Sequence, residues 1–297
     1  MNTQKFYPDN VPSSAKIQRF IQDVNDISLH DSIVLKALEV SKNIPDVEAA
    51  FLFGSLSEGN GDIFSDIDFY LMIEDRHDYS GILDSFLSKI ESLGEIIHIY
   101  QSNAKKNSVI VYLKPFIKFE LVVETFSTLC DEWRLGARAT LLFDKNGMGQ
   151  QALDISKRLE FNMGRHLDEI RNLALSLPAF CFLISGYMLR GEHVTIVDFV
   201  AWIRRKMLRI SGFLLGMWDE GTRRAEQRFP ENLIQYYERC KVKEMEDVWE
   251  CLMVFLEWYS KWMVPKLEDY DIIHVGQEIP VIKSAIVKLR KKFSKKS

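Results

Sequence analysis

The sequence predicts an α+β protein, in which a small domain with a mixed β-sheet precedes a domain built only of helices. Up to residue 149, short apolar runs recur between glycine, proline and polar residues, which is typical of strands. Beyond that point, apolar residues recur every three or four positions almost to the end, which is typical of amphipathic helices. A chain of 297 residues is also long enough for two domains. We therefore expect domains at 1–149 and 150–297.

The first domain is predicted to combine helices with strands. Ser13-Ser14 suits the N-cap of a helix over 13–29, and Pro45 lies just beyond a second helix over 31–41. The expected strands cover residues 47–53, 67–73, 95–100, 109–113, 116–123 and 140–143. Further helices are expected over 79–93 and 127–135. Lys114-Pro115 predicts a hairpin turn between two of the strands.

The second domain is predicted to be helical throughout. The expected helices cover 152–160 with a continuation towards 175, and then 179–189, 196–217, 231–240, 244–263 and 280–293. Five of the six tryptophans lie in this half of the chain. We expect most of them to pack between helices, because large aromatic side chains dominate buried cores.

Composition excludes several classes of protein. The formal net charge of −4 provides no general attraction for nucleic acid. The first residues contain no apolar leader, and apolar runs such as 179–189 are shorter than the ~20 residues that cross a bilayer. The four cysteines have no CxxC spacing, which favours reduced thiols over a disulfide framework or a zinc site. We expect a cytoplasmic protein with neither a membrane nor a nucleic-acid partner.

A pair of aspartates in the first domain points to metal chemistry. An apolar strand runs into Gly54-Ser55, whose backbone N–H groups are able to hold phosphate oxygens, and Asp66 and Asp68 follow on the next strand. Residues two apart on a strand share one face, about 6.6 Å from each other. The alternative is a solvent-facing pair on an edge strand. Aspartate is a poor strand former, however, and two like charges on one face repel unless a cation lies between them. The pair therefore favours a Mg²⁺ site.

Glu120 is a third candidate, because it lies within an apolar strand that could neighbour the aspartates. Three carboxylates around two Mg²⁺ ions suit an in-line displacement at phosphorus, in which Glu120 could also act as a general base. The alternative is a surface residue paired with Lys118, which shares its face. Spacing alone leaves both interpretations open. Two other acidic residues, Glu58 and Asp62, are expected to be solvated in a mobile loop.

These residues, in this order, resemble the nucleotidyltransferase (polymerase-beta-like) superfamily. Its pattern is Gly-Ser, then Asp-x-Asp about ten residues later, then a lone acidic residue on a later strand. The resemblance implies a catalytic domain at 1–149, two Mg²⁺ ions, and ATP or another nucleoside triphosphate as co-substrate. It implies that Asp66, Asp68 and Glu120 are the metal ligands and catalytic residues. It also implies that Gly54-Ser55 and Ser65 contact the nucleotide.

A closer resemblance, to the lincosamide nucleotidyltransferases, extends over the segments 59–70, 116–121, 141–147 and 188–193. Those enzymes transfer a nucleoside monophosphate to a hydroxyl of lincomycin or clindamycin. The resemblance to them implies a helical domain at 150–297 that binds the acceptor and forms a homodimer. One departure concerns the loop after Gly-Ser, where relatives often have a basic residue and this chain has Leu56-Ser57-Glu58.

The function expected from the sequence is therefore Mg²⁺-dependent nucleotidyl transfer to a small antibiotic, a lincosamide in the first place, with drug resistance as the result. An aminoglycoside acceptor is the first alternative. It is disfavoured by Arg204, Arg205, Lys206 and Arg209, because aminoglycosides are polycations. The second alternative is a non-catalytic protein of the same fold that only binds nucleotide or regulates a partner. The filled carboxylate positions argue against it.

Overall fold

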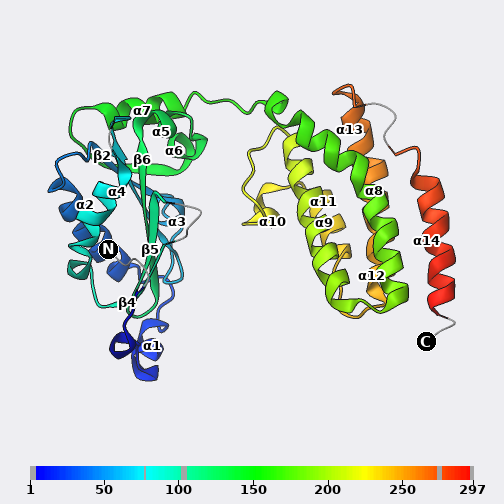
Figure 1. Ribbon diagram of the computed structural model, residues 1–297, viewed down its shortest axis with the longest axis horizontal. Coiled ribbons are helices and arrows are strands. Elements are labelled where there is room, and N and C mark those ends of the chain that lie inside the picture. The colour runs from blue at the N-terminus through cyan, green and yellow to red at the C-terminus, as the bar shows by residue number, and fades with distance from the viewer. Residues whose placement is uncertain (1–4, 77, 102–105, 273–275, 295–297) are drawn as a thin grey trace. The chain divides into compact units, whose positions relative to one another are not determined.

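A computed structural model describes residues 5–76, 78–101, 106–272 and 276–294 (Figure 1). The chain divides into two compact units, Met1–Leu159 and Glu160–Ser297. The first contains a mixed sheet with helices and the second is helical, so the predicted α+β class is confirmed. The division lies after Leu159 rather than after residue 149. The reason is that helix α7 (Met148–Ser156) packs on the sheet unit, where the Ser156 hydroxyl accepts a hydrogen bond of 2.7 Å from the Gly136 amide.

In the described part of the first unit, seven strands form one sheet in the order β1-β4-β5-β6-β3-β2-β7. They are β1 (Lys5–Phe6), β2 (Ala49–Phe53), β3 (Ile67–Ile73), β4 (Ile96–Tyr100), β5 (Ser108–Leu113), β6 (Ile117–Thr125) and β7 (Ala139–Asp144). Strands β3 and β6 pair in parallel, and the other neighbours pair antiparallel. The six strands expected from the sequence are all present, with ends shifted by one or two residues. The turn at Lys114-Pro115 joins β5 to β6 as predicted.

The helices of this unit differ in length from those expected: 14–20 and 79–87 are shorter than predicted, whereas 28–42 is longer. They are α1 (Ser14–Phe20), α2 (Ser28–Lys42), α3 (Gly54–Ser57), α4 (Tyr79–Leu87), α5 (Phe126–Cys130) and α6 (Trp133–Arg138), with 3₁₀ turns at Pro8–Asn10 and Ile90–Ser92. Ser13 caps α1 as predicted, by accepting a hydrogen bond from the Lys16 amide. The single helix expected over 127–135 is wrong. It divides in two because Thr125 caps α5 and Glu132 caps α6.

Helices cover the two faces of the sheet in separate layers (Figure 1). On one face, Ile67, Phe69 and Leu71 of β3 point into a hydrophobic core that includes side chains of α2 and α4. On the other face, α5, α6 and α7 cover Phe51 and Phe53 of β2. Because side chains alternate along a strand, the polar residues between the β3 core positions face the α5–α7 layer. The candidate carboxylates lie on this second face.

The second unit contains α8 (Leu167–Arg190), α9 (His193–Leu214), α10 (Ala225–Arg228), α11 (Glu231–Arg239), α12 (Asp247–Trp258), α13 (Val264–Glu268) and α14 (Ile279–Phe293). A 3₁₀ turn at Met163–His166 precedes α8, and a π-helical turn at Tyr259–Met263 follows α12. The expected helix running from 152 towards 175 is wrong, because the chain breaks between α7 and α8. Helix α8 then continues through Pro178 to Arg190.

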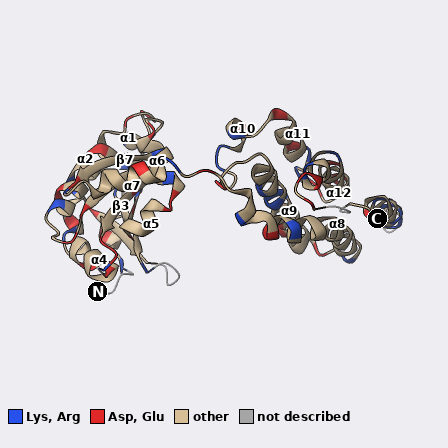
Figure 2. Ribbon diagram, turned by 90° about the horizontal axis from the view of Figure 1, so that it is seen from above, with Lys and Arg blue, Asp and Glu red and all other residues tan. Residues whose placement is uncertain are grey.

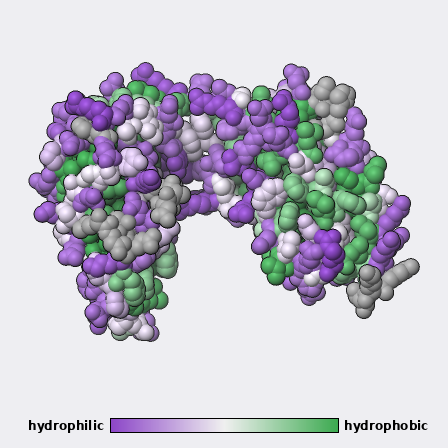
Figure 3. All heavy atoms as spheres, viewed as in Figure 1, coloured by the Kyte–Doolittle hydropathy of each residue, from purple (hydrophilic) through white to green (hydrophobic). Residues whose placement is uncertain are grey.

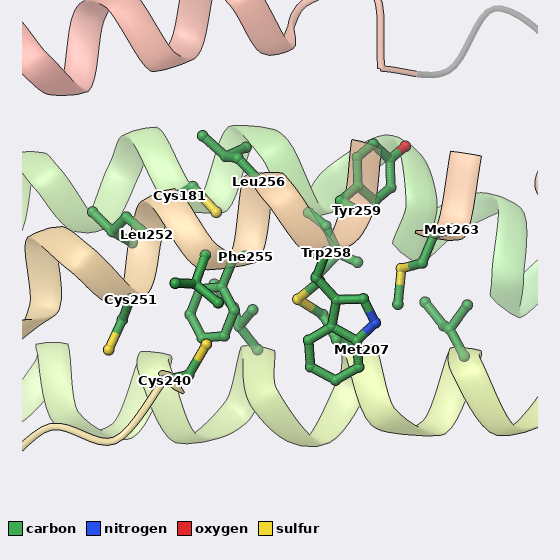
Figure 4. Close-up of a cluster of buried hydrophobic side chains, with 14 of the residues drawn as sticks. Cys181, Met207, Cys240, Cys251, Leu252, Phe255, Leu256, Trp258, Tyr259 and Met263 are labelled. Carbon is green, nitrogen blue, oxygen red and sulfur yellow. The ribbon is translucent and has the colours of Figure 1, made fainter. Parts of the chain in front are cut away.

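The core of the second unit combines aliphatic, aromatic and sulfur-containing side chains (Figure 4). Trp249 and Trp258 are fully buried, as predicted, whereas the other three tryptophans of this unit are half-buried. Tyr259 is also buried, and its hydroxyl donates to the Ala174 carbonyl at 2.7 Å, which ties α8 to the end of α12. The predicted free thiols are confirmed: Cys130, Cys181, Cys240 and Cys251 form no disulfide, and the last three are buried.

Helix α8 is more apolar than the sequence analysis allowed. Among the described residues, Met163–Arg190 is long and apolar enough to cross a membrane by length and composition. This corrects the expectation that every apolar run is too short. Core helices of soluble proteins pass the same test, so it is weak evidence for a membrane. Here Ile170, Leu177 and Ile184 are buried in the core of the unit.

Candidate active site

The parallel pairing of β3 with β6 brings two of the candidate carboxylates side by side. Asp68 lies opposite Glu120 in the register of this pair, and opposite Phe53 on β2. Strand β3 is therefore an inner strand, so the alternative of an edge-strand pair is wrong. Asp66 lies one residue before β3 begins. All three carboxylate residues are half-buried, so they are both held by the fold and accessible from outside.

Lys118 links Asp66 to Glu120. Its Nζ lies 2.9 Å from Asp66 Oδ2 and 3.1 Å from Glu120 Oε2. Burial by itself lowers the pKa of Lys118, but the two hydrogen bonds outweigh burial and raise the pKa above its usual value. The ammonium is therefore charged at neutral pH. The pairing of Glu120 with Lys118, considered from the sequence as an alternative to metal binding, is present in the structure.

The chemistry of this cluster fits a hard cation. Within the described residues, no three His, Cys, Asp or Glu side chains are close enough together to hold a metal ion as they stand. The cluster nevertheless supplies carboxylate oxygens from Asp66, Asp68 and Glu120, which are the ligands that Mg²⁺ prefers. It also already holds one positive charge, the Lys118 ammonium, between two of them. These residues fit a divalent cation by donor type and charge.

Gly54 lies directly against Asp68. The glycine has φ +77°, and a Cβ built on it would come 2.9 Å from Asp68 Oδ2. The positive φ strains any residue with a side chain, and a Cβ here would push the Asp68 carboxylate aside. Gly54 is the first residue of α3, a four-residue helix where a simple turn was expected. The predicted phosphate turn and the predicted metal ligand are thus neighbours.

The hydroxyls of Ser55 and Ser65 bind each other. Ser55 Oγ donates to Ser65 Oγ at 2.9 Å, and Ser65 Oγ lies 3.3 Å from Asp62 Oδ1. His30 supports the same loop from α2, with Nε2 lying 3.2 Å from the Ser65 carbonyl. Burial lowers the pKa of His30, so its ring is neutral at pH 7. The structure therefore brings Ser65 to Ser55, where its hydroxyl also holds the loop together.

The loop after Gly54-Ser55 is fastened more firmly than expected. Glu58 Oε1 lies 3.4 Å from Arg138 Nε, and Ser57 Oγ lies 2.8 Å from Thr140 Oγ1. Asp62 accepts a hydrogen bond from the Phe64 amide at 2.8 Å. The expectation that Glu58 and Asp62 are merely solvated is therefore wrong. Both residues hold the loop to itself or to the α6–β7 segment.

Sequence reasoning missed Arg134, on the first turn of α6. Glu132 binds its guanidinium at two points, with Nε to Oε1 at 2.9 Å and Nη2 to Oε2 at 2.7 Å. These hydrogen bonds raise the pKa of Arg134. Arg134 and Glu132 line a hollow together with Tyr70 and Val122. No sequence signal marks Arg134, because it reaches the site through the placing of a short helix.

That hollow adjoins the carboxylates. Tyr70 follows Asp68 by two residues on β3, and Val122 follows Glu120 by two on β6, so all four lie on one face of the sheet. Burial raises the pKa of Tyr70 to about 12, so its hydroxyl stays protonated at neutral pH. The ion pair of Arg134 with Glu132 thus lines a hollow on the same face of the sheet as the Asp68–Glu120 pair.

Comparison with known proteins supports the fold of the first unit. Residues 36–114 match the family described as "Polymerase beta, Nucleotidyltransferase". The matched segment contains Gly54, Ser55, Asp66 and Asp68, whereas Glu120 lies just beyond it. The matched segment lies within the mixed-sheet unit, and the helical unit follows it in the chain. No curated protein matches the sequence.

Several solved structures align with about nine tenths of this chain at low identity. An aminoglycoside 6-adenyltransferase from Bacillus subtilis is 13% identical with a TM-score of 0.36, covering 89% of this chain and 97% of that one. A nucleotidyltransferase-like protein from Exiguobacterium sibiricum is 12% identical with a TM-score of 0.39, covering 91% of each chain. The spectinomycin adenyltransferase AAD(9) from Enterococcus faecialis, solved with ATP and spectinomycin, is 10% identical with a TM-score of 0.34, covering 91% and 100%. At TM-scores this low, the similarity gives no information about the substrate of this protein.

Proposed function

We propose that this protein is a Mg²⁺-dependent nucleotidyltransferase that transfers a nucleoside monophosphate from ATP, or another nucleoside triphosphate, to a hydroxyl of a small antibiotic. The observation that carries the proposal is the parallel register of Asp68 with Glu120, with Gly54 packed against Asp68. This arrangement joins a carboxylate pair to a turn whose N–H groups suit phosphate oxygens. It is formed by residues that are far apart in the sequence and belong to three different strands or turns.

In this proposal, Asp66, Asp68 and Glu120 would hold two Mg²⁺ ions. Bound there, the ions would neutralise negative charge on the departing pyrophosphate. Glu120 would accept the proton of the acceptor hydroxyl. The acceptor oxygen would form a bond to the α-phosphorus while the bond from that phosphorus to the bridging oxygen breaks, and pyrophosphate would leave. The rate would depend mainly on positioning and charge, as in phosphoryl transfer generally.

Arg134 would supply the positive charge that the loop after Gly54-Ser55 lacks. Backbone N–H groups of Gly54 and Ser55 would seat the β- and γ-phosphates, and the guanidinium of Arg134 would bind a phosphate from the neighbouring hollow. Arginine suits this role because its planar fork binds two phosphate oxygens at once. Glu132 would act as a positioning residue, because it holds the guanidinium at two points.

The choice of acceptor rests on the sequence resemblance, which favours a lincosamide. The structure weakens the argument against an aminoglycoside, which was the positive charge of the basic residues on α9. Arg209 is neutralised by Glu169 at 3.1 Å and Asp219 at 3.3 Å, and Lys206 lies 4.0 Å from Glu169. Two of the four basic residues in this stretch of α9, which is blue in Figure 2, are thus paired with acidic residues. An aminoglycoside therefore remains the second candidate, with the helical unit as the proposed acceptor-binding part in either case.

The test is a transfer assay with a panel of acceptors. The protein is incubated with Mg²⁺ and ATP together with lincomycin, clindamycin or an aminoglycoside, and pyrophosphate release and acceptor mass are measured. We expect pyrophosphate and a gain of one nucleotide unit on a lincosamide, and loss of both in a folded Asp68→Asn variant. An aminoglycoside product would correct the acceptor and keep the reaction. ATP binding without a product on any acceptor would favour the non-catalytic alternative, and full transfer by the variant would refute the metal assignment.

A further inference from the structure

Two buried thiols of the helical unit interact with each other. Cys240 directly follows α11, and Cys251 lies on the second turn of α12. Cys251 Sγ lies 3.9 Å from the carbonyl oxygen of Lys241, the residue next to Cys240. The two thiols also share a hydrogen bond, and Figure 4 shows their sulfur atoms near each other. Two thiols from neighbouring helices are therefore in contact within one core.

Arg204 of α9 brings a positive charge to this pair. Its Nη1 donates to the Cys240 carbonyl at 3.3 Å, and its guanidinium carbon lies 4.8 Å from the centroid of the Tyr237 ring. In the part of the chain that the structure describes, Arg204 pairs with no carboxylate, and its buried Nε has no hydrogen-bond partner. A partly buried cation without a carboxylate favours negative charge beside it. The two thiols are ionisable groups on which its charge acts.

Cys251 differs from the other three cysteines in its acidity. The hydrogen bond with Cys240 lowers the pKa of Cys251, burial opposes this effect, and the charge of Arg204 lowers the pKa further. Burial raises the pKa of Cys130, Cys181 and Cys240. Because the thiolate is the reactive form of cysteine, Cys251 is the best nucleophile of the four. Cys240 is the second thiol beside it.

The arrangement suits oxidation rather than metal binding. Among the described residues, no three His, Cys, Asp or Glu side chains are placed to hold a metal ion, whereas two thiols are enough for a disulfide. The connection between α11 and α12 is hydrophilic, with Lys241, Lys243 and Glu244 exposed. It contrasts with the face along α8, where hydrophobic residues gather in Figure 3. Because Cys251 touches this connection at Lys241, local opening there would let a small oxidant reach the thiol.

We propose that Cys240 and Cys251 form a dithiol that hydrogen peroxide converts to a disulfide joining α11 to α12. Cys251 Sγ bonds to one peroxide oxygen while the O–O bond breaks, and the departing hydroxide takes up a proton to become water. Cys240 Sγ then bonds to the sulfur of the resulting sulfenic acid. The S–O bond breaks, and the hydroxide leaves with the Cys240 proton as a second water. The two thiols together lose two electrons, and the peroxide gains them.

This proposal concerns the helical unit alone, and it holds whether or not the protein transfers nucleotides. The test treats the full chain with hydrogen peroxide, denatures it, alkylates the free thiols with iodoacetamide and maps the peptides by mass spectrometry. We expect a peptide in which Cys240 is joined to Cys251, and we expect dithiothreitol to restore both thiols.

Three cysteine variants divide the reaction into its steps. Cys181→Ser is the matched control, because it removes another buried thiol of the same core, and it should form the disulfide at the wild-type rate. Cys240→Ser should stop at a sulfenic acid on Cys251, which dimedone traps. Cys251→Ser should leave Cys240 unmodified, since the nucleophile of the first step is missing.

Arg204→Gln tests the role assigned to the charge. The substitution removes one influence that lowers the pKa of Cys251, whereas Asp247 and Glu250 on α12 still raise it. One unit of pKa changes the thiolate population about tenfold, so peroxide should react about tenfold more slowly near pH 7, with a smaller difference at higher pH. Arg204→Lys keeps the charge and should react like the wild type. A variant that only loosens the core would expose the thiols and react faster at every pH.

Several results would overturn the proposal. One is a wild-type protein that forms no disulfide even at peroxide concentrations that convert its methionines to sulfoxides. Another is a disulfide that includes Cys130 or Cys181 in place of Cys240. A third is a wild-type Cys251 that ends as a sulfinic acid without a cross-link. Equal rates for Arg204→Gln and the wild type across the pH range would refute the role of Arg204.

Discussion

Replacing Gly54 by alanine should greatly reduce activity with only a modest loss of stability. The substitution places a side chain on a residue with φ +77°, which costs about 1–2 kcal/mol. It also places a Cβ 2.9 Å from Asp68 Oδ2. The atom in the way is the end of a flexible side chain, so the fold can relieve the contact by moving the carboxylate. Relief of that kind adds little to the loss of stability, but it displaces a proposed metal ligand.

Gly59→Ala is the matched control for this prediction. Gly59 has φ +71° in the same loop, and a Cβ built there meets no atom within 4 Å. Both variants should therefore lose about 1–2 kcal/mol of unfolding free energy, measured by urea denaturation. Only Gly54→Ala should lose transfer, by about 100-fold in kcat/KM, which corresponds to about 2.7 kcal/mol. Equal transfer by the two variants would refute the link between the turn and Asp68.

Three further substitutions test other parts of the site. Arg134→Gln should raise the KM for ATP while AMP binding stays unchanged, and equal weakening of ATP and AMP in calorimetry would contradict a phosphate contact. Lys118→Met leaves Asp66 and Glu120 without their shared ammonium, so these carboxylates should bind Mg²⁺ more tightly. Mg²⁺ should therefore raise the melting temperature of this variant more than that of the wild type. An equal rise in both proteins would show that Lys118 does not affect Mg²⁺ binding. The pKa of His30 is lowered by burial, so the unfolded chain binds the proton more tightly and stability should fall as pH drops below about 6.5. His30→Asn should flatten that part of the pH profile of unfolding free energy, and an unchanged profile would assign it to other groups.

The sequence predicted those features of the site that depend on local pattern. Asp68 and Glu120 were recognisable because each interrupts an apolar strand, and alternation alone places them on the face opposite Phe69 and Leu121. Their meeting depends on the parallel pairing of β3 with β6, strands that are separated by two others in the chain. No local pattern specifies that pairing, so the sequence left the role of Glu120 open.

The contribution of α6 to the site could not be predicted from hydrophobic periodicity either, but for a different reason. Residues 127–135 have continuous helical periodicity, but the caps by Thr125 and Glu132 divide the segment. The division turns α6 so that Arg134 reaches the sheet face beside Tyr70. Capping hydrogen bonds of about 1 kcal/mol each thus decided an arrangement that hydrophobic spacing could not. The same limit applies to the break between α7 and α8.

The parallel register of β3 with β6 has a consequence for how errors in folding would affect the site. A shift of β6 by one residue would turn Glu120 into the hydrophobic core beneath α2 and α4, and would expose Phe119 in its place. Burying an unpaired carboxylate and exposing a phenyl ring are both strongly unfavourable. A chain with a misassembled site would therefore also lack a stable core. Such a chain would be unfolded or degraded, rather than persist as a stable but inactive protein.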